Sequence, residues 1–506
     1  MLSGDLLGER ARLTPERLAL VEVETGERST YAELNRRSTL LARAWTERLG
    51  IRKGDRVALL SQNSSRFIEA FFAAGKTGAI LVPLNTRLTA REHAAILADC
   101  RPRLLLFGEG CEAAAAEAAE TAQVQGLKTL GLEDPSRSPG LAAAEFENVS
   151  CAPEDPYCLL YTSGTTGRPK GVILPHRMIL WNGYNTALGW QLRADDVSPI
   201  FTPLYHAGGL GVFLVPLFTL GGTIVLLRGF DAAQVLRVLA AEHCTVVLGV
   251  PTIFKLLADA PEFATADLQT VRWFISGGAP LPLALLGRYR QRGLVLKQGY
   301  GLTEVGVNCF AMSEEESVAK AGSIGKPLPF TRARLVDESG REVAAGEVGE
   351  LLLAGPHVAS GYWGDPAATA AAFDNEGFFH TGDLARRDEE GFFYIVGRRK
   401  EMLISGGVNV YPAEIEAELL THPQVSDAAV TGAPHETWGE VPVAFVVTAA
   451  GVRLSAEEIL DYLAPRLARY KLPKAVVFLE ALPRTAYGKV VKAELRELYL
   501  APRKDS

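Results

Sequence analysis

The sequence predicts an α/β protein with a large N-terminal domain of mixed sheets covered by helices and a small α+β C-terminal domain. Its 506 residues exceed what one domain usually holds. Over the first 400 residues, short β-branched runs alternate with glycine turns and alanine-rich helices, a pattern typical of parallel or mixed sheets. The last hundred residues begin again with a helix and contain enough elements for a compact unit of their own.

The first elements follow this alternation. Residues 55–60 (DRVALL) predict a strand, residues 65–79 a helix and residues 80–84 a second strand. Two strands joined by a helix run parallel, so these three elements predict one strand–helix–strand unit. Residues 109–156 differ, because an alanine- and glutamate-rich helix is followed by turn-forming residues with no clear strand after Leu132. We expect this segment to be a surface elaboration or a joint between sub-domains.

One apolar run could be read as a transmembrane segment. Residues 207–227 are 21 residues without a charge, which by length alone could cross a bilayer. The run contains five glycines and Pro216, and a Gly221-Gly222 turn divides it into two apolar halves. Glycine pairs of this kind separate elements, so the run predicts a helix followed by a strand in a protein core. No transmembrane segment is predicted.

The C-terminal domain is expected to begin at the charged turn GRRKE, residues 397–401. This gives a domain of residues 1–397 and a second of residues 398–506. The second domain should contain helix, strand, strand, helix and strand at residues 413–425, 427–434, 441–448, 455–470 and 474–480.

Charge and cysteine pattern argue against a nucleic-acid-binding protein and against a secreted, disulfide-linked one. The 52 Lys and Arg against 59 Asp and Glu give a net charge of -7, whereas nucleic-acid binding needs a concentrated basic face. We therefore expect no nucleic-acid partner. The six cysteines include no CxxC pair, and the N-terminus has no apolar signal stretch, so free thiols, a reducing compartment and a cytoplasmic location are expected.

The most informative segment is LLYTSGTTGRPKGV, residues 159–172. An apolar strand ends at Tyr161 and leads into a loop of hydroxyl side chains, glycines and Lys170. Glycine lets backbone N–H groups turn toward a ligand, hydroxyls add donors and lysine adds charge, which together suit a phosphate. The loop is not a Walker A motif, because Pro169 and Gly171 stand where that motif needs Gly and Ser or Thr. A P-loop kinase or ATPase is therefore disfavoured.

Six further segments follow in order along the chain: PLYHAGGLG (203–211), WFISGGAPL (273–281), GYGLTE (299–304), FHTGDLA (379–385), GRRKEMLISGG (397–407) and LPRTAYGKV (482–490). With the phosphate loop, they resemble the adenylate-forming enzymes, which include acyl-CoA synthetases, luciferases and the adenylation domains of peptide synthetases. The resemblance covers essentially the whole chain and is strongest to the fatty-acid–CoA ligases. It implies that the small C-terminal domain rotates about a hinge.

The resemblance assigns the nucleotide-binding residues. The loop resembles the family's phosphate loop, which holds the β- and γ-phosphates of ATP through Thr162, Ser163, Gly164, Thr165, Thr166, Gly167 and Lys170. The backbone of Gly277, Gly278 and Ala279 resembles the wall between adenine and acyl pocket. In the segment 299–304, the family implies that Tyr300, between Gly299 and Gly301, stacks on adenine. It also implies that Thr303 meets the α-phosphate and Glu304 binds Mg²⁺, for which a carboxylate and phosphate oxygens are suitable ligands.

The same resemblance assigns the ribose, hinge and thiol sites. Asp383 is implied to accept the two ribose hydroxyls with Arg398 as a second contact, and Lys400 stands at the hinge. His206 lies at the implied junction of the carboxylate and pantetheine channels, and Gly406 and Gly407 lie where the CoA arm passes. Lys489 is implied to be the cation that meets the carboxylate and the α-phosphate, so the catalytic set is Lys489, Thr303, Glu304 and His206. Ile404 replaces the lysine of plant aryl-CoA ligases and luciferases, a departure that favours bacterial acyl-CoA synthetases.

The leading functional hypothesis is an acyl-CoA synthetase for a medium- or long-chain fatty acid, with ATP and CoA as co-substrates and Mg²⁺ as cofactor. The small residues after His206 slightly favour a fatty chain. An aryl acid ligase for feruloyl-, coumaroyl- or benzoyl-like acids is the alternative, followed by an adenylation domain that charges a carrier protein. A luciferase-like oxygenase shares the first step and stays open, whereas a non-catalytic nucleotide-binding homologue is disfavoured because all the site residues are present together. Peripheral membrane contact and a homodimer are left open.

Overall fold

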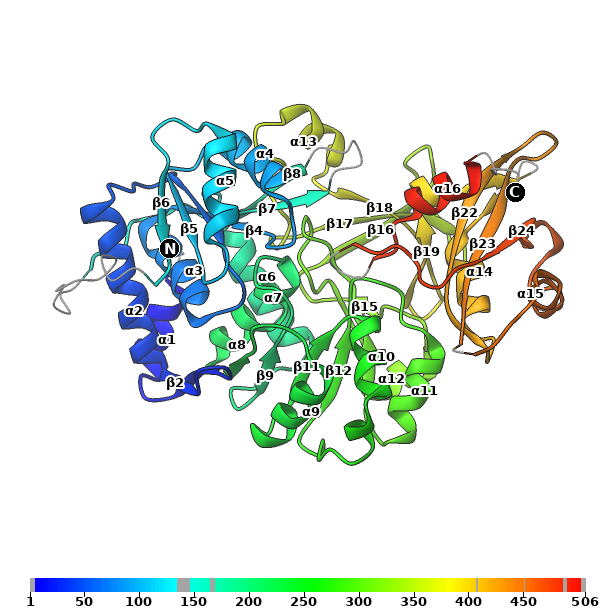
Figure 1. The fold of residues 1–506 in the computed structure, drawn as a ribbon, viewed down its shortest axis with the longest axis horizontal. Helices are drawn as coiled ribbons and strands as arrows, with labels where there is room; N and C mark the ends of the chain where they lie inside the picture. The colour runs from blue at the N-terminus through cyan, green and yellow to red at the C-terminus, as the bar shows by residue number, and fades with distance from the viewer. Residues whose placement is uncertain are drawn as a thin grey trace.

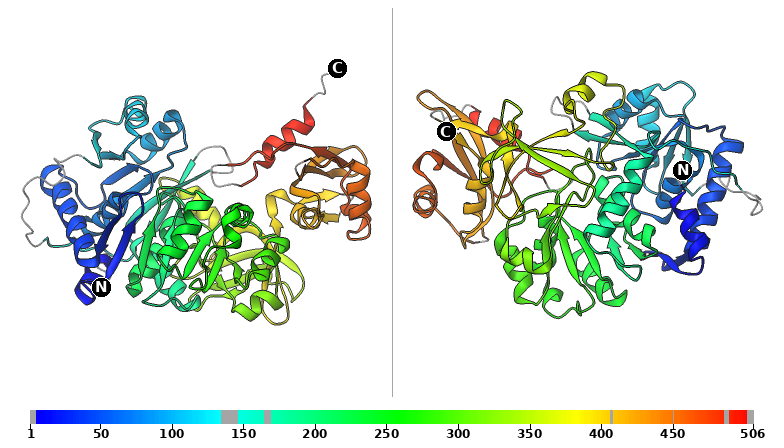
Figure 2. Two further views of the ribbon diagram at one scale, coloured as in Figure 1. Left: turned by 60° about the horizontal axis from the view of Figure 1, so that its bottom comes forward. Right: turned by 180° about the vertical axis from the view of Figure 1, so that it is seen from behind.

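The computed structural model describes residues 5–133, 146–163, 169–405, 408–449, 451–485 and 489–501, and at Ser163 it describes the backbone alone. The chain forms a large part and a smaller part that contains the C-terminal strands (Figure 1). The turned views of Figure 2 show the same division. The predicted α/β class, with a large N-terminal and a small C-terminal domain, is confirmed.

A six-stranded sheet lies near the N-terminus in the strand order β6-β5-β3-β4-β7-β8. Its first five strands are parallel, and β8 runs antiparallel to β7. Its strands and the helices between them are β3 (Arg56–Leu60), α3 (Ser65–Thr77), β4 (Ile80–Leu84), α4 (Ala90–Cys100), β5 (Leu104–Phe107), α5 (Glu112–Ala122), β6 (Lys128–Gly131), β7 (Pro156–Ser163) and β8 (Pro169–Pro175).

The predicted unit of residues 55–84 is confirmed as β3, α3 and β4. Helix α3 begins where the Ser64 side chain accepts a hydrogen bond from the backbone N–H of Phe67, and it ends at Gly78, whose φ of 67° suits glycine. Nearly every α3 residue is buried, because the helix packs in the main hydrophobic core. Of residues 109–156, the described part forms α5, β6 and the start of β7, and residues 134–145 lie outside the description.

Two more sheets complete this region, one in the order β2-β1-β10-β9 and one of the parallel strands β11-β12-β13. The elements, in chain order, are α1 (Leu6–Leu13), β1 (Leu18–Glu22), β2 (Glu27–Thr30), α2 (Tyr31–Arg43), η1 (Ala44–Arg48), α6 (His176–Gly189), β9 (Val197–Ile200), α7 (Ala207–Gly209), η3 (Leu210–Leu214), α8 (Val215–Leu220), β10 (Thr223–Leu226), α9 (Ala232–Ala241), β11 (Val246–Gly249), α10 (Pro251–Asp259), η4 (Pro261–Ala264), β12 (Trp273–Ser276), α11 (Leu283–Gln291) and β13 (Leu296–Gln298).

The uncharged run 207–227 forms the helical segments α7, η3 and α8 and then strand β10, as predicted. Helix α8 ends at Gly221, which has a φ of 93°, a conformation that favours glycine. Within the described ranges, the helices are all too short or too polar to cross a bilayer. All six cysteines are free and buried.

An antiparallel sheet, β16-β17-β18-β19, lies between the N-terminal sheets and the C-terminal part in Figure 1. This region contains β14 (Phe310–Ala311), α12 (Glu314–Ala319), β15 (Lys326–Pro327), β16 (Arg332–Val336), β17 (Val348–Ala354), α13 (Pro366–Ala372), β18 (Phe379–Arg387) and β19 (Phe393–Arg398). Arg398 is the last residue of β19, so the expected domain boundary after residue 397 falls at the end of this strand.

The C-terminal part has its own sheet, in the order β21-β20-β23-β22 with β24 beside β23. Its elements are η5 (Arg399–Glu401), β20 (Leu403–Ser405), β21 (Val408–Val410), α14 (Pro412–Leu419), β22 (Val425–His435), β23 (Gly439–Thr448), α15 (Ala456–Leu463), η6 (Arg469–Lys471), β24 (Ala475–Phe478) and α16 (Lys492–Leu500). The five predicted elements are confirmed in type and order, but both helices are shorter than predicted: α14 ends at Leu419 and not at 425, and α15 ends at Leu463 and not at 470. The strands β20 and β21 and helix α16 were not predicted.

Candidate active site

The predicted phosphate loop joins two paired strands. Strand β7 leads into the loop and β8 leaves it, and in this antiparallel pair Thr162 lies opposite Lys170. The sheet therefore fixes both ends of the loop. Gly164, Thr165, Thr166 and Gly167 lie outside the described residues, as does the side chain of Ser163.

The turn after β12 is held by a residue that the sequence did not reveal. Gln298, the last residue of β13, accepts a hydrogen bond from the Leu281 N–H at 2.9 Å and donates to the Ala279 carbonyl at 3.3 Å. Gly278 has a φ of 79°, which glycine adopts without strain. The predicted wall of Gly277, Gly278 and Ala279 is thus fixed from the neighbouring strand.

The segment after β13 continues along the same edge. The Gly299 N–H donates to the Ser276 carbonyl at 2.7 Å, which joins this segment to the end of β12. A Cβ at Gly301 would lie 2.3 Å from the Gly306 carbonyl oxygen, so the close approach of the two backbones requires glycine there. This packing fixes the backbone on either side of Tyr300.

Tyr300, Asp383 and Arg398 form one hydrogen-bonded group. The Tyr300 hydroxyl donates to Asp383 Oδ2 at 2.6 Å, and Arg398 Nε lies 3.0 Å from Asp383 Oδ1. Asp383 and Arg398 are direct partners on the antiparallel strands β18 and β19, which explains why residues 15 positions apart meet. Burial raises the pKa of Asp383, against the lowering effect of Arg398 and of the Tyr300 hydrogen bond. The structure therefore brings together the two predicted ribose contacts and the predicted adenine-stacking residue.

Glu304 lies close to a tyrosine that the sequence analysis did not single out. The Tyr362 hydroxyl donates to Glu304 Oε1 at 3.3 Å, and Lys170 Nζ lies 5.2 Å from the centre of the Tyr362 ring. Burial is the main cause that raises the pKa of Glu304, and the Tyr362 hydrogen bond acts in the opposite direction.

The residues around Glu304 suit a magnesium ion held mainly by a nucleotide. Mg²⁺ is commonly bound by one or two carboxylates together with phosphate oxygens and water. Among the described residues no group of three or more His, Cys, Asp or Glu side chains could hold a metal ion. A partly buried carboxylate that belongs to no such group among the described residues fits an ion that arrives with phosphates.

An apolar cavity lies next to Thr303. Ala207, Leu210 and Val307 are among its lining residues. Asn182, also in the lining, uses both ends of its amide: it donates to the Gly211 carbonyl at 2.7 Å and accepts from the Val307 N–H at 3.3 Å. Asn182 therefore joins two walls of the cavity and leaves its interior apolar.

His206 directly precedes α7, whose first residue, Ala207, lines this cavity. Its Nδ1 accepts a hydrogen bond from the Gly208 N–H at 3.1 Å, which fixes the ring orientation. Burial first, and the charge of Lys489 second, lower the pKa of His206 to about 4. His206 is therefore neutral near pH 7, and the effect of Lys489 places the C-terminal lysine close to it.

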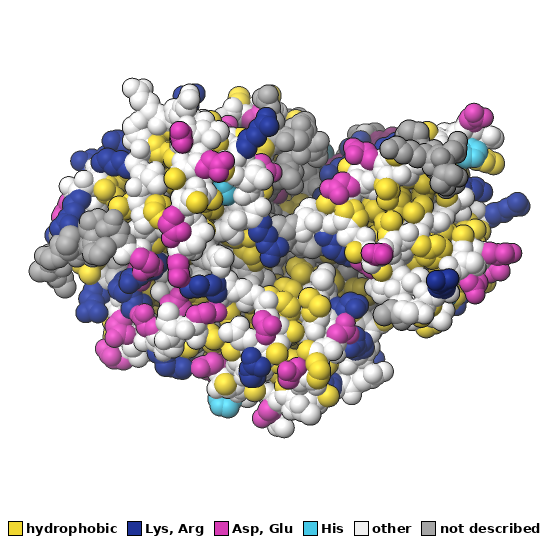
Figure 3. All heavy atoms as spheres, in the orientation of Figure 1, with side chains coloured by type: hydrophobic (Ala, Val, Ile, Leu, Met, Phe, Trp, Pro, Cys, Tyr) yellow, Lys and Arg dark blue, Asp and Glu magenta, His cyan; other side chains and the backbone are white. Residues whose placement is uncertain are grey.

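Lys489 lies on the C-terminal part, close enough to Arg398, Asp383 and Glu304 for their charges to act on it. Its backbone exchanges hydrogen bonds with Thr485, whose N–H donates to the Lys489 carbonyl at 2.7 Å. Lys489 keeps an exposed surface, yet partial desolvation and then the Arg398 charge lower its pKa, while Asp383 and Glu304 raise it. Figure 3 shows the surface hollowed where the two parts meet, with Lys and Arg side chains at its sides.

The predicted hinge and thiol residues are only partly described. Lys400 is exposed in η5, between the last strand of the β16–β19 sheet and the first strand of the C-terminal sheet. Its charge is among the causes that lower the pKa of Lys489. Gly406 and Gly407 lie outside the described residues.

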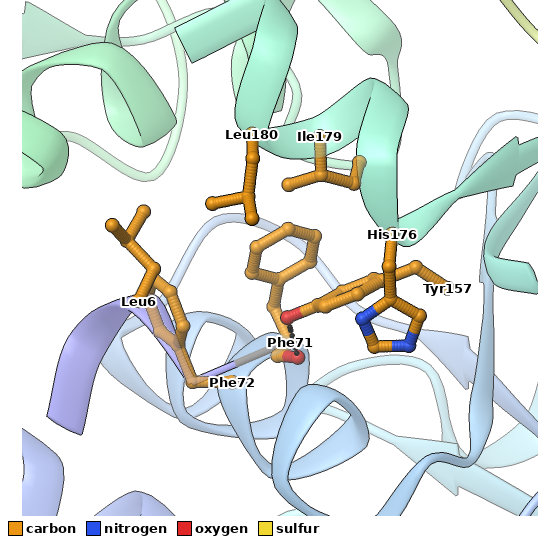
Figure 4. A pocket seen from close by; sticks show the side chains of 7 residues that line it. All are labelled: Leu6, Phe71, Phe72, Tyr157, His176, Ile179 and Leu180. Carbon is orange, nitrogen blue, oxygen red and sulfur yellow. Dashed lines mark hydrogen bonds between the residues drawn. The ribbon is translucent and has the colours of Figure 1, made fainter. Parts of the chain in front are cut away.

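A second small cavity lies deeper in the N-terminal part (Figure 4). Ile179 lines both cavities, and His176 lines only the deeper one. Among the residues that the structure describes, neither ring nitrogen of the buried His176 has a hydrogen-bond partner, and burial lowers the pKa of His176 to about 4. Tyr157 donates its hydroxyl to the Phe71 carbonyl beside this cavity. Its lining contains none of the predicted site residues that the structure describes, so this cavity is not assigned to the candidate active site.

Comparisons with known proteins show the family to which the chain belongs. The family profile described as AMP-binding enzyme matches residues 7–363, and that of the AMP-binding enzyme C-terminal domain matches residues 414–489. The chain is 41% identical over 490 residues to a feruloyl-CoA synthase of an Amycolatopsis species, covering 97% of both chains. It is 39% identical over 504 residues to the long-chain-fatty-acid–CoA ligase FadD13 of Mycobacterium tuberculosis, covering 98% of both. The solved O-succinylbenzoate coenzyme A synthetase of Bacillus subtilis, in complex with ATP and magnesium ion, matches with a TM-score of 0.87 at 34% identity, over 97% of this chain and 99% of that chain.

Proposed function

The chain belongs to the AMP-binding enzymes and is an ATP-dependent acyl- or aryl-CoA ligase, and we propose that it activates a medium- or long-chain fatty acid. One observation carries the proposal. The charges of Glu304, Asp383 and Arg398, which come from distant parts of the chain, all act on the pKa of Lys489, and Thr303, next to Glu304 in the chain, lines an apolar cavity. The cavity contacts Thr303, so an acid whose tail fills it has its carboxylate near the charged group.

The first step joins the acid to AMP. A carboxylate oxygen attacks the α-phosphorus of ATP, the bond to the bridging oxygen breaks, and pyrophosphate leaves. A fatty acid is already ionised at neutral pH, since carboxyl groups of this type have a pKa of about 4 to 5. The site therefore needs no general base, and its task is to hold two anions together and to stabilise the charge that develops.

The side chains divide this task. Lys489 meets the carboxylate and the α-phosphate, Thr303 donates to the α-phosphate, and Thr162, Lys170 and the loop between them hold the outer phosphates. Asp383 accepts the ribose hydroxyls, with Arg398 beside it and Tyr300 against the adenine. Glu304 would hold the magnesium ion, which supplies positive charge to the phosphates when bound.

The second step transfers the acyl group to CoA. The CoA thiolate attacks the acyl carbon and AMP leaves; a thiol with a pKa of about 8.5 is a few per cent thiolate at pH 7, enough for so activated an ester. We propose that the C-terminal domain rotates about Lys400 between the steps, while Arg398, at the end of β19, stays on the large part. Lys489 then withdraws, and Gly406 and Gly407 line the thiol channel with His206.

A panel of acids tests this proposal. Pyrophosphate release is measured with saturated fatty acids of increasing length and with hydroxycinnamic and benzoic acids, each with and without CoA. We expect the highest kcat/KM for a fatty acid, because the polar amide of Asn182 is already bonded and offers little to a phenol hydroxyl. A preference for aryl acids would overturn the fatty-acid assignment, and no release with any acid would overturn adenylation itself.

An aryl acid is the second candidate. The observation that favours it is the 41% identity, over nearly the whole chain, to a protein described as a feruloyl-CoA synthase. An aromatic ring would also fit an apolar cavity of this kind. The same panel decides between the two classes of acid.

A further inference from the structure

Tyr362 lies between two residues that the proposed function assigns to the phosphates and to magnesium. Its hydroxyl donates to Glu304 Oε1 at 3.3 Å, and its ring faces Lys170 Nζ, 5.2 Å from the ring centre. A cation at this distance from an aromatic ring is attracted to its face. One side chain therefore contacts both the predicted metal carboxylate and the lysine of the phosphate loop.

The backbone around Tyr362 is fixed to the strand that leaves the phosphate loop. The Ile173 N–H donates to the Gly361 carbonyl at 2.9 Å, and the Trp363 N–H donates to the Gly171 carbonyl at 2.7 Å. Tyr362 itself forms an antiparallel bridge with Val172 of β8. The position of the ring relative to Lys170 thus follows from pairing with β8.

The same segment is also fixed to Glu304. The Ala359 N–H donates to the Glu304 carbonyl at 2.8 Å, only three residues before Tyr362. The chain from residue 359 to 363 therefore ties the end of the phosphate loop to the backbone of the predicted metal ligand. The Tyr362 side chain in turn contacts the side chains of both Lys170 and Glu304.

We propose that Tyr362 is a positioning residue for MgATP: its hydroxyl orients the Glu304 carboxylate toward the metal, and its ring holds the Lys170 ammonium at the phosphates. A carboxylate with one oxygen bonded has less rotational freedom to lose when it binds an ion. A lysine held against a ring likewise loses less side-chain entropy on meeting a phosphate. This inference rests on the proposed function, because both neighbours take their roles from it.

Two substitutions separate the hydroxyl from the ring. Tyr362→Phe keeps the ring under Lys170 and removes only the hydroxyl, whereas Tyr362→Leu removes both. Tyr394→Phe is the matched control, because Tyr394 also donates to a carboxylate, Asp388 Oδ2, at 3.3 Å, on the surface of the β16–β19 sheet. Thermal unfolding of each variant shows whether the fold is retained.

The readout is ATP binding by titration calorimetry, in excess Mg²⁺ and in EDTA, without acid or CoA. We expect Tyr362→Phe to reduce the gain in ATP affinity that Mg²⁺ provides by about three- to tenfold, as for the loss of a typical hydrogen bond, and to leave affinity in EDTA unchanged. Tyr362→Leu should weaken binding in both buffers, and Tyr394→Phe in neither.

The outcomes distinguish this inference from the proposed function. A Tyr362→Phe protein with the full magnesium gain, or with equal losses in both buffers, overturns the role of the hydroxyl. A Tyr362→Leu protein that binds ATP normally in EDTA overturns the role of the ring. In all three cases wild-type ATP binding is intact and the proposed function stands, whereas a wild-type protein that binds no ATP overturns both.

Discussion

The two halves of the candidate active site are built in different ways. Tyr300, Asp383 and Arg398 are joined by side-chain hydrogen bonds within the large part of the molecule, and two of them are partners on adjacent strands. Lys489 lies on the C-terminal part, and its backbone bonds to Thr485 fix a turn of that part only. The proposed nucleotide-binding group is therefore preformed, whereas the position of Lys489 depends on the placement of a separate unit.

This difference suggests a division of labour. A preformed group binds the nucleotide in either placement of the C-terminal part, so ATP affinity should depend on Asp383 and little on Lys489. The positive charge proposed to bring the acid carboxylate and the α-phosphate together is present only when the C-terminal part places Lys489 in the site. Substitutions in the two halves should accordingly affect different measured quantities.

The largest expected effect is that of Lys489→Ala. Removing one preorganised donor from a developing charge typically costs two to three orders of magnitude in rate, so we expect pyrophosphate release to fall by about 10²- to 10³-fold. Thioester formation from supplied acyl-adenylate should stay within a factor of a few. Lys474→Ala, at an exposed lysine of the same C-terminal part, is the control. Equal loss of both half-reactions would refute the division.

Asp383→Asn should weaken ATP binding more than any change at Lys489. The substitution replaces the carboxylate proposed to accept the ribose hydroxyls by an amide, and losing a hydrogen bond to a charged group costs about 2 kcal/mol, which is roughly 30-fold in affinity. Calorimetric titration of ATP measures the change. Asp388→Asn, at another hydrogen-bonded aspartate of the same sheet, should leave affinity unaltered. A small effect of Asp383→Asn would contradict a preformed ribose site.

Tyr300→Phe should have a smaller effect on the same measurement. The ring proposed to stack on adenine is retained, and only the hydrogen bond to Asp383 is lost, for which about 1 kcal/mol, or roughly fivefold in affinity, is expected. The catalytic rate at saturating ATP should be nearly unchanged. A large loss of rate with unchanged affinity would show that Tyr300 acts in the chemical step instead.

The smallest expected effect concerns His206 and reports directly on the position of Lys489. Burial and the Lys489 charge together lower the pKa of His206 to about 4, so removing the lysine stabilises the imidazolium and the pKa should rise. Burial remains, so the pKa should stay below the ordinary value of about 6.5. NMR titration of labelled imidazoles in wild-type and Lys489→Ala protein measures the difference. An unaltered pKa would mean that the lysine does not lie near His206 in solution.

Sequence reasoning identified residues that lie on short, self-contained segments. The strand–loop–strand around Lys170 and the turn before Asp383 carry their signal locally, as do the helix and strand of residues 207–227. The order of the strands in the six-stranded sheet has no such local signal, because it depends on which distant segments pair. Gln298, Asn182 and Tyr362 were missed for the same reason: Tyr362 matters through Glu304, 58 positions away in the chain.

The most direct test of the account follows oxygen from the acid to AMP. Acid labelled with ¹⁸O in both carboxylate oxygens is incubated with wild-type protein, ATP, Mg²⁺ and CoA, and the products are analysed by mass spectrometry. Attack of the carboxylate on the α-phosphorus, followed by thiol attack on the acyl carbon, leaves one ¹⁸O in each AMP, and this is the predicted result. Unlabelled AMP, or ¹⁸O in inorganic phosphate together with ADP, would contradict the account.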